Sequence, residues 1–331
     1  MARITEGLLR AQHIILSTHV NADGDGAGCE AAVAAWLTQV GKTVSIVNPT
    51  PFPDAYRFLI TRPEWIVDLN DAASAAVLKQ ADAVLVLDTG EPKRIGKVAG
   101  SLTGKTVFVM DHHPSSPIGF QGVQLLDPAA CATGELVYDL FLQVGLQEPW
   151  PEACRVGIYT AIVTDTGSFR FSNTTPRAHA LVGDLIRQGV DPELAYRRLF
   201  GTVPLRRIEL LRQALASLEV DAEYPITSVS IARAILDGTG ATADDLEGLV
   251  EHARSIAGTE VALLFRETSD GGTKVSLRSN GELDVNAIAR QFGGGGHIKA
   301  SGAVVSAPLD VTRARVLEAT RQALAALTPK P

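Results

Sequence analysis

Two short apolar segments limit most strongly what this chain can fold into. The segments 81–88 (ADAVLVLD) and 105–111 (KTVFVMD) are apolar at most positions, and each ends in an aspartate. A strand that is apolar on both faces must be covered on both sides, as the strands of parallel sheets are. Residues 13–18 and 42–48 resemble these segments, and Ala- and Leu-rich stretches separate them. The first half of the chain therefore predicts an α/β fold, with a mainly parallel sheet flanked by helices.

The helical stretches between these strands have recognisable ends. Thr174 or Thr175 can cap a helix that begins at Pro176, because a proline suits the first turn. We also expect helices over about residues 26–40, 133–144 and 151–164. In sheets of this class, ligands bind beyond the carboxyl ends of the strands. We therefore expect the active site at the edge where the apolar segments end.

A different pattern begins at about Tyr224. Three segments alternate like half-exposed strands; they are residues 226–234, 260–268 and 273–280. A short helical segment, a glycine-rich run and a closing helix over 309–327 follow, which predicts a smaller α+β unit. A chain of 331 residues is long enough for two domains. We place the catalytic domain at 1–190, a helical linker at 191–222 and the second domain at 223–331.

Composition and charge exclude several classes of protein. No apolar run approaches the ~18–20 residues that span a bilayer, and the first residues lack the apolar core of a signal peptide. The cysteines Cys29, Cys131 and Cys154 form no C-x-x-C pair, which disfavours disulfides and a thiolate zinc site. We expect a cytoplasmic protein without membrane contact. The net charge of −7 argues against binding to long duplex DNA, although a few basic side chains can hold a short substrate.

Four fragments carry ligands that hard metal ions prefer. They are HVNADGDG (19–26), VLDTG (86–90), VMDHHP (109–114) and VTDTGSF (163–169). Taken singly, each Asp or His is more often a turn, cap or core residue, but the four together indicate one site. The candidate ligands are His19, Asp23, Asp25, Asp88, His112 and Asp165.

The number and type of these ligands favour a pair of metal ions. Carboxylates combined with imidazoles suit Mn²⁺, and Mg²⁺ or another divalent ion less well, whereas the lack of thiolates disfavours structural Zn²⁺. Six ligands are too many for one catalytic ion that must keep open positions. Two ions that share a carboxylate use them naturally and can clamp a phosphoryl group.

The sequence resembles the DHH phosphoesterase superfamily. The triplet that gives this superfamily its name is Asp111-His112-His113 in this chain. The other three motifs occur in the same order. The segment 292–303 (FGGGGHIKASGA) is similar to the DHHA1 substrate-binding domain, which distinguishes the chain from family II pyrophosphatases. In length and arrangement the chain is most similar to the NrnA-like oligoribonucleases, or nanoRNases, some of which also dephosphorylate 3'-phosphoadenosine 5'-phosphate.

The resemblance implies a role for each motif residue. It implies one Mn²⁺ held by His19, Asp23 and Asp88, and a second held by Asp25, Asp88, His112 and Asp165, with Asp88 bridging. Two residues would act beside the ions; Asp111 would orient a histidine, and His113 would contact the phosphate or the leaving group. Asn21-Ala22 stands where relatives often have a proline, a difference that we expect to change loop stiffness rather than ligation.

The glycine run can be a mobile linker or part of a substrate site. Backbone N–H groups without side chains can line an anion, and the His and Lys that follow add donors. The resemblance favours the second interpretation and implies substrate contacts at Gly294, Gly295, Gly296, His297, Lys299 and Ser301. Arg278 can clamp a phosphate or simply face solvent, and Arg170 can meet a phosphate. Phe169 or Phe171 can stack on a base, although core packing is expected for at least one.

The leading hypothesis is a Mn²⁺-dependent phosphodiesterase that degrades RNAs of about two to five nucleotides to mononucleotides. The closest alternative is hydrolysis of cyclic or linear dinucleotides of the c-di-AMP or pApA type. A RecJ-like exonuclease for single-stranded DNA ranks lower, because the chain lacks a further strand-binding domain and a basic surplus. A nucleotide-binding sensor without catalysis is disfavoured by the complete ligand set. The expected partner is a short RNA or dinucleotide, and a homodimer stays open.

Overall fold

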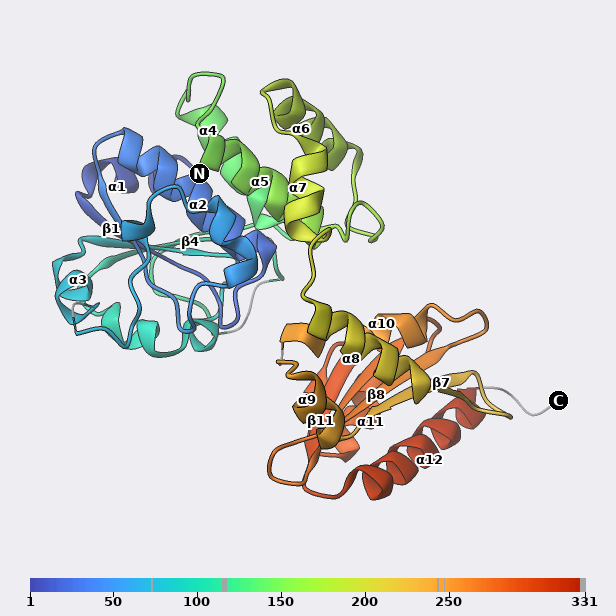
Figure 1. Cartoon of the computed structure of the whole chain (residues 1–331). Helices are drawn as coiled ribbons and strands as arrows, with labels where there is room; N and C mark the ends of the chain where they lie inside the picture. The colour runs from blue at the N-terminus through green and yellow to red at the C-terminus, as the bar shows by residue number, and fades with distance from the viewer. Residues whose placement is uncertain (73, 115–117, 243, 247, 328–331) are drawn as a thin grey trace. The chain divides into compact units, whose positions relative to one another are not determined.

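The structure is a computed structural model that describes residues 1–72, 74–114, 118–242, 244–246 and 248–327. The chain divides into two compact units, Met1–Thr202 and Val203–Pro331, and each is described by itself (Figure 1). Among the described residues, no helix combines the length and the apolar character that crossing a bilayer requires.

The first unit contains a five-stranded sheet in the order β2-β1-β3-β4-β5. Every neighbouring pair is parallel, which confirms the predicted fold class. The strands are β1 (His13–Ser17), β2 (Thr43–Ile46), β3 (Ala83–Leu87), β4 (Thr106–Asp111) and β5 (Val123–Leu126). The edge strand β5 was not predicted, because its four residues are too few to show a clear pattern, with the exposed Gln124 among half-buried apolar residues.

Helices cover both faces of this sheet (Figure 1). Ile14 and Leu16 of β1 point into one core and Ile15 into the other, because successive side chains of a strand face opposite ways. The larger core is covered by α1 (Ala2–Arg10), α2 (Gly24–Gln39), α4 (Thr133–Gln143), α5 (Glu152–Asp165) and α6 (Pro176–Arg187). The smaller core is covered by α3 (Ser74–Gln80) and the 3₁₀ segment η3 (Pro92–Ser101). Shorter elements are η1 (Asp54–Leu59), η2 (Pro63–Trp65) and α7 (Pro192–Leu199).

Helices α2 and α5 cross where both lack a side chain. A Cβ atom on Gly28 would lie 2.3 Å from the carbonyl oxygen of Gly157, and one on Gly157 would lie 2.4 Å from that of Gly28. Gly134 of α4 approaches Ala161 of α5 in the same way, since its Cβ atom would lie 2.5 Å from the methyl group. These close approaches fix how the start of α2, the start of α4 and the end of α5 lie together.

The second unit is a six-stranded sheet in the order β10-β11-β9-β8-β7-β6. Only β7 and β8 pair in parallel; the other described pairs are antiparallel, as an α+β unit predicts. The strands are β6 (Glu219–Val220), β7 (Ile226–Ile231), β8 (Val261–Glu267), β9 (Thr273–Ser279), β10 (Gly295–Gly296) and β11 (Ala300–Val305).

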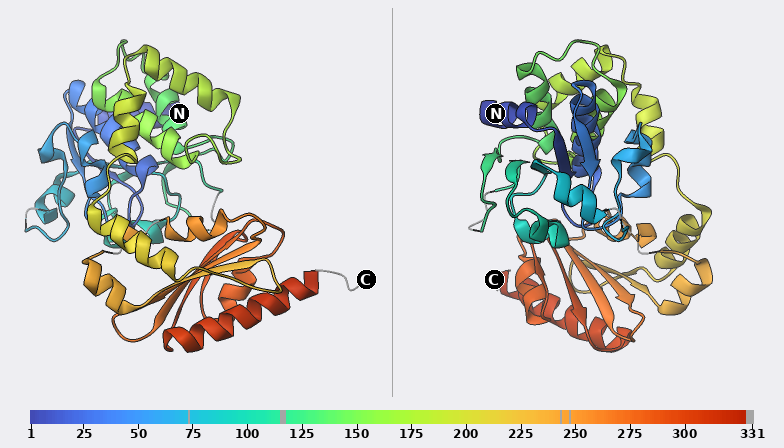
Figure 2. Two further views of the ribbon diagram at one scale, coloured as in Figure 1. Left: turned by 45° about the vertical axis from the view of Figure 1, so that its right-hand side comes forward. Right: turned by 90° about the vertical axis from the view of Figure 1, so that its left-hand side faces the viewer.

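Helices lie on both faces of this sheet as well, and Figure 2 shows α12 along one of them. That face carries α11 (Val285–Gln291) and α12 (Leu309–Leu327), and the other carries α8 (Leu205–Ala216), α9 (Arg233–Thr239), η4 (Asp244–Leu246) and α10 (Leu249–Arg254). The prediction of half-exposed strands is therefore wrong for β7 and β8, which are almost entirely buried. It holds for β9, where Lys274, Ser276 and Arg278 are more exposed than their neighbours.

Most predicted helices are found within a few residues of their expected ends. The helix expected from residue 26 begins at Gly24, because Asp23 caps it by accepting hydrogen bonds from the backbone of Asp25 and Gly26. Thr175 caps α6 as predicted, and its hydroxyl accepts from the backbone N–H of Ala178. The segment 191–222, proposed as a linker, contributes α7 to the first unit and α8 to the second.

The glycine crossing predicts a position-dependent response to added methyl groups. Gly28→Ala must push α2 away from α5, and overpacking of this kind costs about 1–3 kcal/mol. Gly183→Ala is the matched control, because this exposed α6 position has nothing within 4 Å of the added Cβ atom and gains roughly 0.5–1 kcal/mol. Urea unfolding of both variants measures the free energy change. If both substitutions change the free energy of unfolding equally, the close crossing of α2 and α5 at Gly28 is contradicted.

Candidate metal centre

The predicted ligands come from strand ends and from helix ends. His19 follows β1, Asp88 follows β3 directly, and His112 follows β4, so these three stand at the carboxyl edge of neighbouring strands. Asp25 lies in the first turn of α2 and Asp165 is the last residue of α5. Two of the acids are thus supplied by helix ends and not by strands.

One group of side chains surrounds the imidazole of His19. Its Nε2 atom lies 3.2 Å from Oδ2 of Asp88 and 3.6 Å from Oδ2 of Asp23. The other ring nitrogen, Nδ1, lies 3.0 Å from the backbone carbonyl of Val20. That carbonyl can accept the ring proton from Nδ1, which leaves the Nε2 lone pair directed at the carboxylates.

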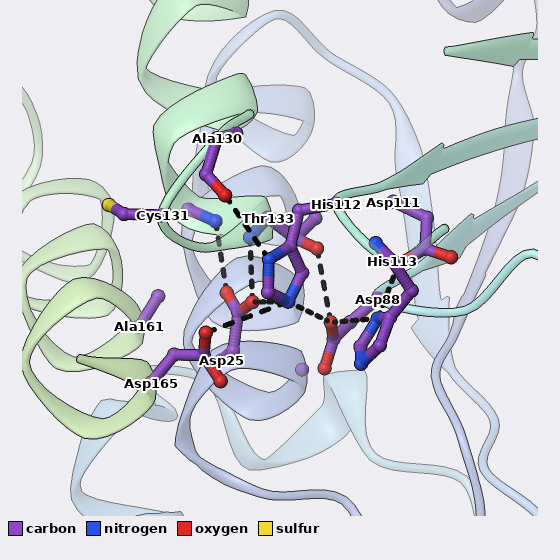
Figure 3. Close-up of polar contacts among 12 residues, drawn as sticks. Asp25, Asp88, Asp111, His112, His113, Ala130, Cys131, Thr133, Ala161 and Asp165 are labelled. Atoms are coloured by element: carbon purple, nitrogen blue, oxygen red, sulfur yellow. Dashed lines mark hydrogen bonds and ion pairs between the residues drawn. The ribbon is translucent and has the colours of Figure 1, made fainter. Parts of the chain in front are cut away.

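A second group surrounds the imidazole of His112 (Figure 3). Its Nε2 atom lies 3.7 Å from Oδ2 of Asp25, 3.6 Å from Oδ1 of Asp88 and 3.6 Å from Oδ2 of Asp165. Its Nδ1 atom faces the backbone carbonyl of Ala130 at 3.4 Å. Both histidines therefore have the same orientation relative to their acids.

Asp88 belongs to both groups. Its Oδ2 atom faces His19 and its Oδ1 atom faces His112, so one carboxylate contacts both sets of ligands. The side chain is almost fully buried, and Oδ1 accepts a hydrogen bond of 3.1 Å from the hydroxyl of Thr133. The backbone of Asp88 has a φ of 60°, a left-handed conformation that is uncommon for a residue other than glycine.

The two Nε2 atoms provide a test of whether a metal ion fits. Among the described residues, neither the Nε2 atom of His19 nor that of His112 has a hydrogen-bond partner, although both are buried. Buried polar atoms are rarely left unsatisfied, and an ion is one of the few ways to satisfy them. The donor atoms of His19, Asp23 and Asp88 all lie within 4.8 Å of one another, and so do those of Asp25, His112 and Asp165. Both sets fit a divalent cation.

Backbone amides hold the acid of the second group in place. Asp25 accepts hydrogen bonds from the backbone N–H groups of Thr133 and Gly134, at 2.6 and 2.9 Å, where α4 begins. A helix start favours a negative charge, because its first N–H groups have no partner within the helix. Asn173 donates from Nδ2 to Oδ2 of Asp165 at 3.1 Å. Thr133, Gly134 and Asn173 were not predicted as site residues, and only the helix start at Thr133 was visible in the sequence.

A buried chain of hydrogen bonds supports the loop that carries His19. The backbone N–H of Thr18 donates to Asn48, and Asn48 donates to the carboxyl group of Glu30 at 2.9 Å. Burial raises the pKa of Glu30 to about 8, so this carboxyl group is largely protonated at neutral pH. Neither Asn48 nor Glu30 was predicted, because each looks like an ordinary polar residue of a strand end or a helix.

Crowding of buried acids shifts their pKa values. Burial and the neighbouring carboxylates of Asp88 and Asp165 raise the pKa of Asp25 well above its usual range. Burial, opposed in part by His112, raises the pKa of Asp165 to about 6. Burial lowers the pKa of His19, but its contacts with Asp23 and Asp88 outweigh that effect and raise the pKa to about 10. Without a cation, the site therefore retains protons at neutral pH.

Asp111 and His113 form a separate pair beside these groups (Figure 3). Oδ1 of Asp111 accepts hydrogen bonds from the ring Nδ1 and the backbone N–H of His113, at 2.8 and 3.0 Å. Nδ1 of His113 also lies 3.6 Å from Oδ1 of Asp88. The hydrogen bond with Asp111 raises the pKa of His113, which favours the protonated imidazole.

In the second unit, the glycine run forms a hairpin. Gly295 and Gly296 make β10, which pairs with Gly302 and Ser301 of β11. The hydroxyl of Ser301 donates to the backbone carbonyl of His297, while the other predicted contacts of this run are exposed or half-buried: Gly294, Gly295, Gly296, His297 and Lys299. The run is thus part of the sheet and not a free linker.

The two predicted arginine contacts lie in different units. Arg278 of β9 is the strand-pairing partner of Ala300, the first residue of β11. Its Nε atom lies 3.3 Å from Oε1 of Glu251. Arg170 belongs to the first unit, where its Nε atom donates to the carbonyl of Gly167. Of the two candidate aromatic residues, Phe169 stacks on His179 and packs against the core, whereas Phe171 is half-exposed.

Comparisons with known proteins agree with this arrangement. Residues 13–162 match the model of the DHH family, N-terminal domain, and residues 227–326 match that of the DHHA1 domain. The bifunctional oligoribonuclease and PAP phosphatase NrnA of Thermus thermophilus is 32% identical over 94% of this chain and 90% of its own. The protein of the same name from Bacillus subtilis is 28% identical over 88% of this chain and 89% of its own.

Solved structures show the same fold. An exopolyphosphatase-related protein from Bacteroides fragilis superposes with a TM-score of 0.88 at 26% identity, covering 98% of this chain and 94% of that one. RecJ from Thermus thermophilus in complex with Mn²⁺ gives a TM-score of 0.52 at 18% identity, covering 100% of this chain and 55% of that one. The second likeness concerns the fold alone.

The raised pKa values predict that a divalent cation displaces protons from the site. Metal ligands must be deprotonated, so binding of Mn²⁺ at pH 7 releases protons from the group that includes His19, and lowering the pH through about 6 weakens binding as Asp165 takes up its proton. Calorimetric titration in two buffers with different ionisation enthalpies measures this release. An apparent binding enthalpy that is the same in both buffers would contradict the prediction.

Proposed function

Because the chain belongs to the DHH family and carries a DHHA1 domain, we propose that it is a metal-dependent phosphodiesterase that hydrolyses RNAs of about two to five nucleotides to mononucleotides. The relatives named as oligoribonuclease and PAP phosphatase cover nearly the whole chain, which supports this choice within the family. The same centre would remove the 3'-phosphate of 3'-phosphoadenosine 5'-phosphate. We place the reaction in the cytoplasm.

One observation carries the proposal: the two oxygens of Asp88 face two different histidine groups. A carboxylate in this position suits a pair of cations, one with His19 and Asp23 and the other with His112 and its two acids. Ligands of this type favour Mn²⁺, with Mg²⁺ as the less suitable alternative. The pair of cations would supply charge neutralisation at the phosphate and a water of lowered pKa.

The chain's own residues would position and protonate the substrate. Asp111 holds Nδ1 of His113, so Nε2 is the ring atom that can donate a proton. A protonated His113 at the edge of the centre can donate to the phosphate or to the departing 3'-oxygen. The backbone amides at the start of α4 hold Asp25 before any substrate arrives, which reduces the reorganisation that binding requires.

The second unit would hold the far end of the substrate. Arg278 can grip a phosphate through two parallel hydrogen bonds, and it stands beside the glycine hairpin that carries His297 and Lys299. Glu251 already contacts the guanidinium and fixes its direction. Arg170 would meet a phosphate from the first unit.

A length series of 5'-labelled RNA and DNA with Mn²⁺ tests the function. We expect mononucleotides from RNAs of about two to five nucleotides, and from linear more than cyclic dinucleotides, with turnover falling steeply for longer strands. Release of phosphate from 3'-phosphoadenosine 5'-phosphate is measured in parallel. A flat profile out to long DNA would replace the proposal by a RecJ-like exonuclease, and binding without any cleavage would replace it by a nucleotide sensor.

Asp88→Asn is the matched control for this series. Asparagine tolerates the left-handed backbone at position 88, so the fold is retained, but its amide nitrogen cannot ligate a cation. We expect turnover of every substrate to fall by more than about 100-fold, the upper end of the losses seen when only an outer partner of a metal ligand is removed. Unchanged turnover in this variant would show that the observed hydrolysis comes from elsewhere.

A further inference from the structure

The first unit contains a pocket that none of the six candidate metal ligands lines. It has a volume of about 440 Å³ and lies beyond the carboxyl ends of β1 and β2. Its walls come from the loop after β2, from the segment after η2 and from η3. Sites for small organic ligands have volumes of roughly 300–1,000 Å³, so the pocket is large enough for a nucleoside.

A single loop separates this pocket from the metal centre. His19 points into the centre, whereas Val20, the next residue, lines the pocket. The loop is fixed on both sides, because the N–H of Val20 donates to the carbonyl of Arg94 and the N–H of Asn21 donates to the hydroxyl of Thr50. A ligand in the pocket therefore lies beside the histidine that faces Asp88.

The pocket combines an apolar wall with a few polar groups. The apolar wall includes Pro49, Phe52 and Ile66, and the polar side includes Asp71 and Lys97. Among the described residues, the side chains of Asp71 and Lys97 have no hydrogen-bond or ion-pair partner. The other charged residues that line it are engaged: Arg57 pairs with Asp54, and Asp68 accepts from Asn70.

We propose that this pocket binds the nucleoside next to the scissile phosphate, an inference that rests on the proposed function. A nucleobase has apolar faces and polar edges, which matches proline and aliphatic side chains opposite amide and carboxylate groups. Asp71 accepts hydrogen bonds from ribose hydroxyls or a base amino group, and Lys97 attracts the phosphate chain. Thus the pocket selects nucleotides over other phosphodiesters, while the metal centre performs the reaction.

A variant that fills the pocket tests this assignment. In Leu69→Trp, the indole occupies the space of the base, and Lys97→Ala removes the free cation. The test compares a dinucleotide with bis(4-nitrophenyl) phosphate, a diester that has no nucleoside and reports on the metal centre alone. We expect KM for the dinucleotide to rise about tenfold or more in Leu69→Trp, with kcat/KM for the small diester unchanged.

Gln80→Trp is the matched control, because Gln80 lines a small pocket of about 50 Å³ at the opposite, amino-terminal edge of the same sheet. We expect Gln80→Trp to leave KM for the dinucleotide and kcat/KM for the small diester unchanged. If Leu69→Trp lowers kcat/KM equally for both substrates, or changes it for neither, the assignment of the pocket is wrong. Thermal melting of each variant identifies loss of fold, and Lys97→Ala keeps the comparison usable if the tryptophan is not tolerated.

A direct binding measurement separates this inference from the proposed function. Saturation-transfer NMR with adenosine and with adenosine 5'-monophosphate reports binding without catalysis. We expect signals with the wild type that are lost in Leu69→Trp and retained in Gln80→Trp. If the wild-type protein binds adenosine but cleaves no dinucleotide, the proposed function is wrong and the pocket assignment stands. If the wild type cleaves the dinucleotide and Leu69→Trp still binds nucleosides as the wild type does, the pocket assignment is wrong and the proposed function stands.

Discussion

The carboxylate of Asp88 lies between two imidazoles, and the first unit is organised around that contact. One oxygen lies 3.2 Å from Nε2 of His19 and the other lies 3.6 Å from Nε2 of His112. Three neighbouring strands end at this point, which brings residues from distant parts of the sequence together. Asp88 has a positive φ, and its side chain lies between His19 and His112. The strained backbone at this residue is therefore associated with the site.

Such a concentration of buried acids is unstable unless positive partners surround it. Like charges at short distance repel strongly in a poorly solvated interior, and burial together with the carboxylates of Asp88 and Asp165 raises the pKa of Asp25. Backbone N–H groups stabilise the acids: the start of α2 donates to Asp23, and the start of α4 donates to Asp25. The close approaches of α2 and α4 to α5, at Gly28 and Gly134, bring those helix starts together. The scaffold therefore reduces the repulsion, and the cations of the proposed function would remove most of what remains.

The sequence alone indicated the candidate ligands at strand ends and helix ends, but not the residues that hold those ligands in place. Asp88 and His112 could be predicted because each follows an apolar strand, and the end of that strand can be recognised in the sequence. Thr133 could not, because its contact with Asp25 arises only once α4 lies against α2. Asn173 contacts Asp165 only because the segment after α5 folds back on the end of that helix. The burial of β8 was mispredicted for a different reason: residues 261–265 are all apolar, which is the pattern of a strand covered on both faces, but the segment was interpreted as alternating.

The most direct test of the account is the position of bound cations relative to Asp88. Crystals soaked in Mn²⁺ and measured at the manganese absorption edge give anomalous peaks that identify the ions without reference to any assumed ligand set. The account predicts two peaks ~3.5–4 Å apart, each within ligand distance of a different oxygen of Asp88. A single peak, or two peaks of which one does not contact Asp88, would contradict the central claim.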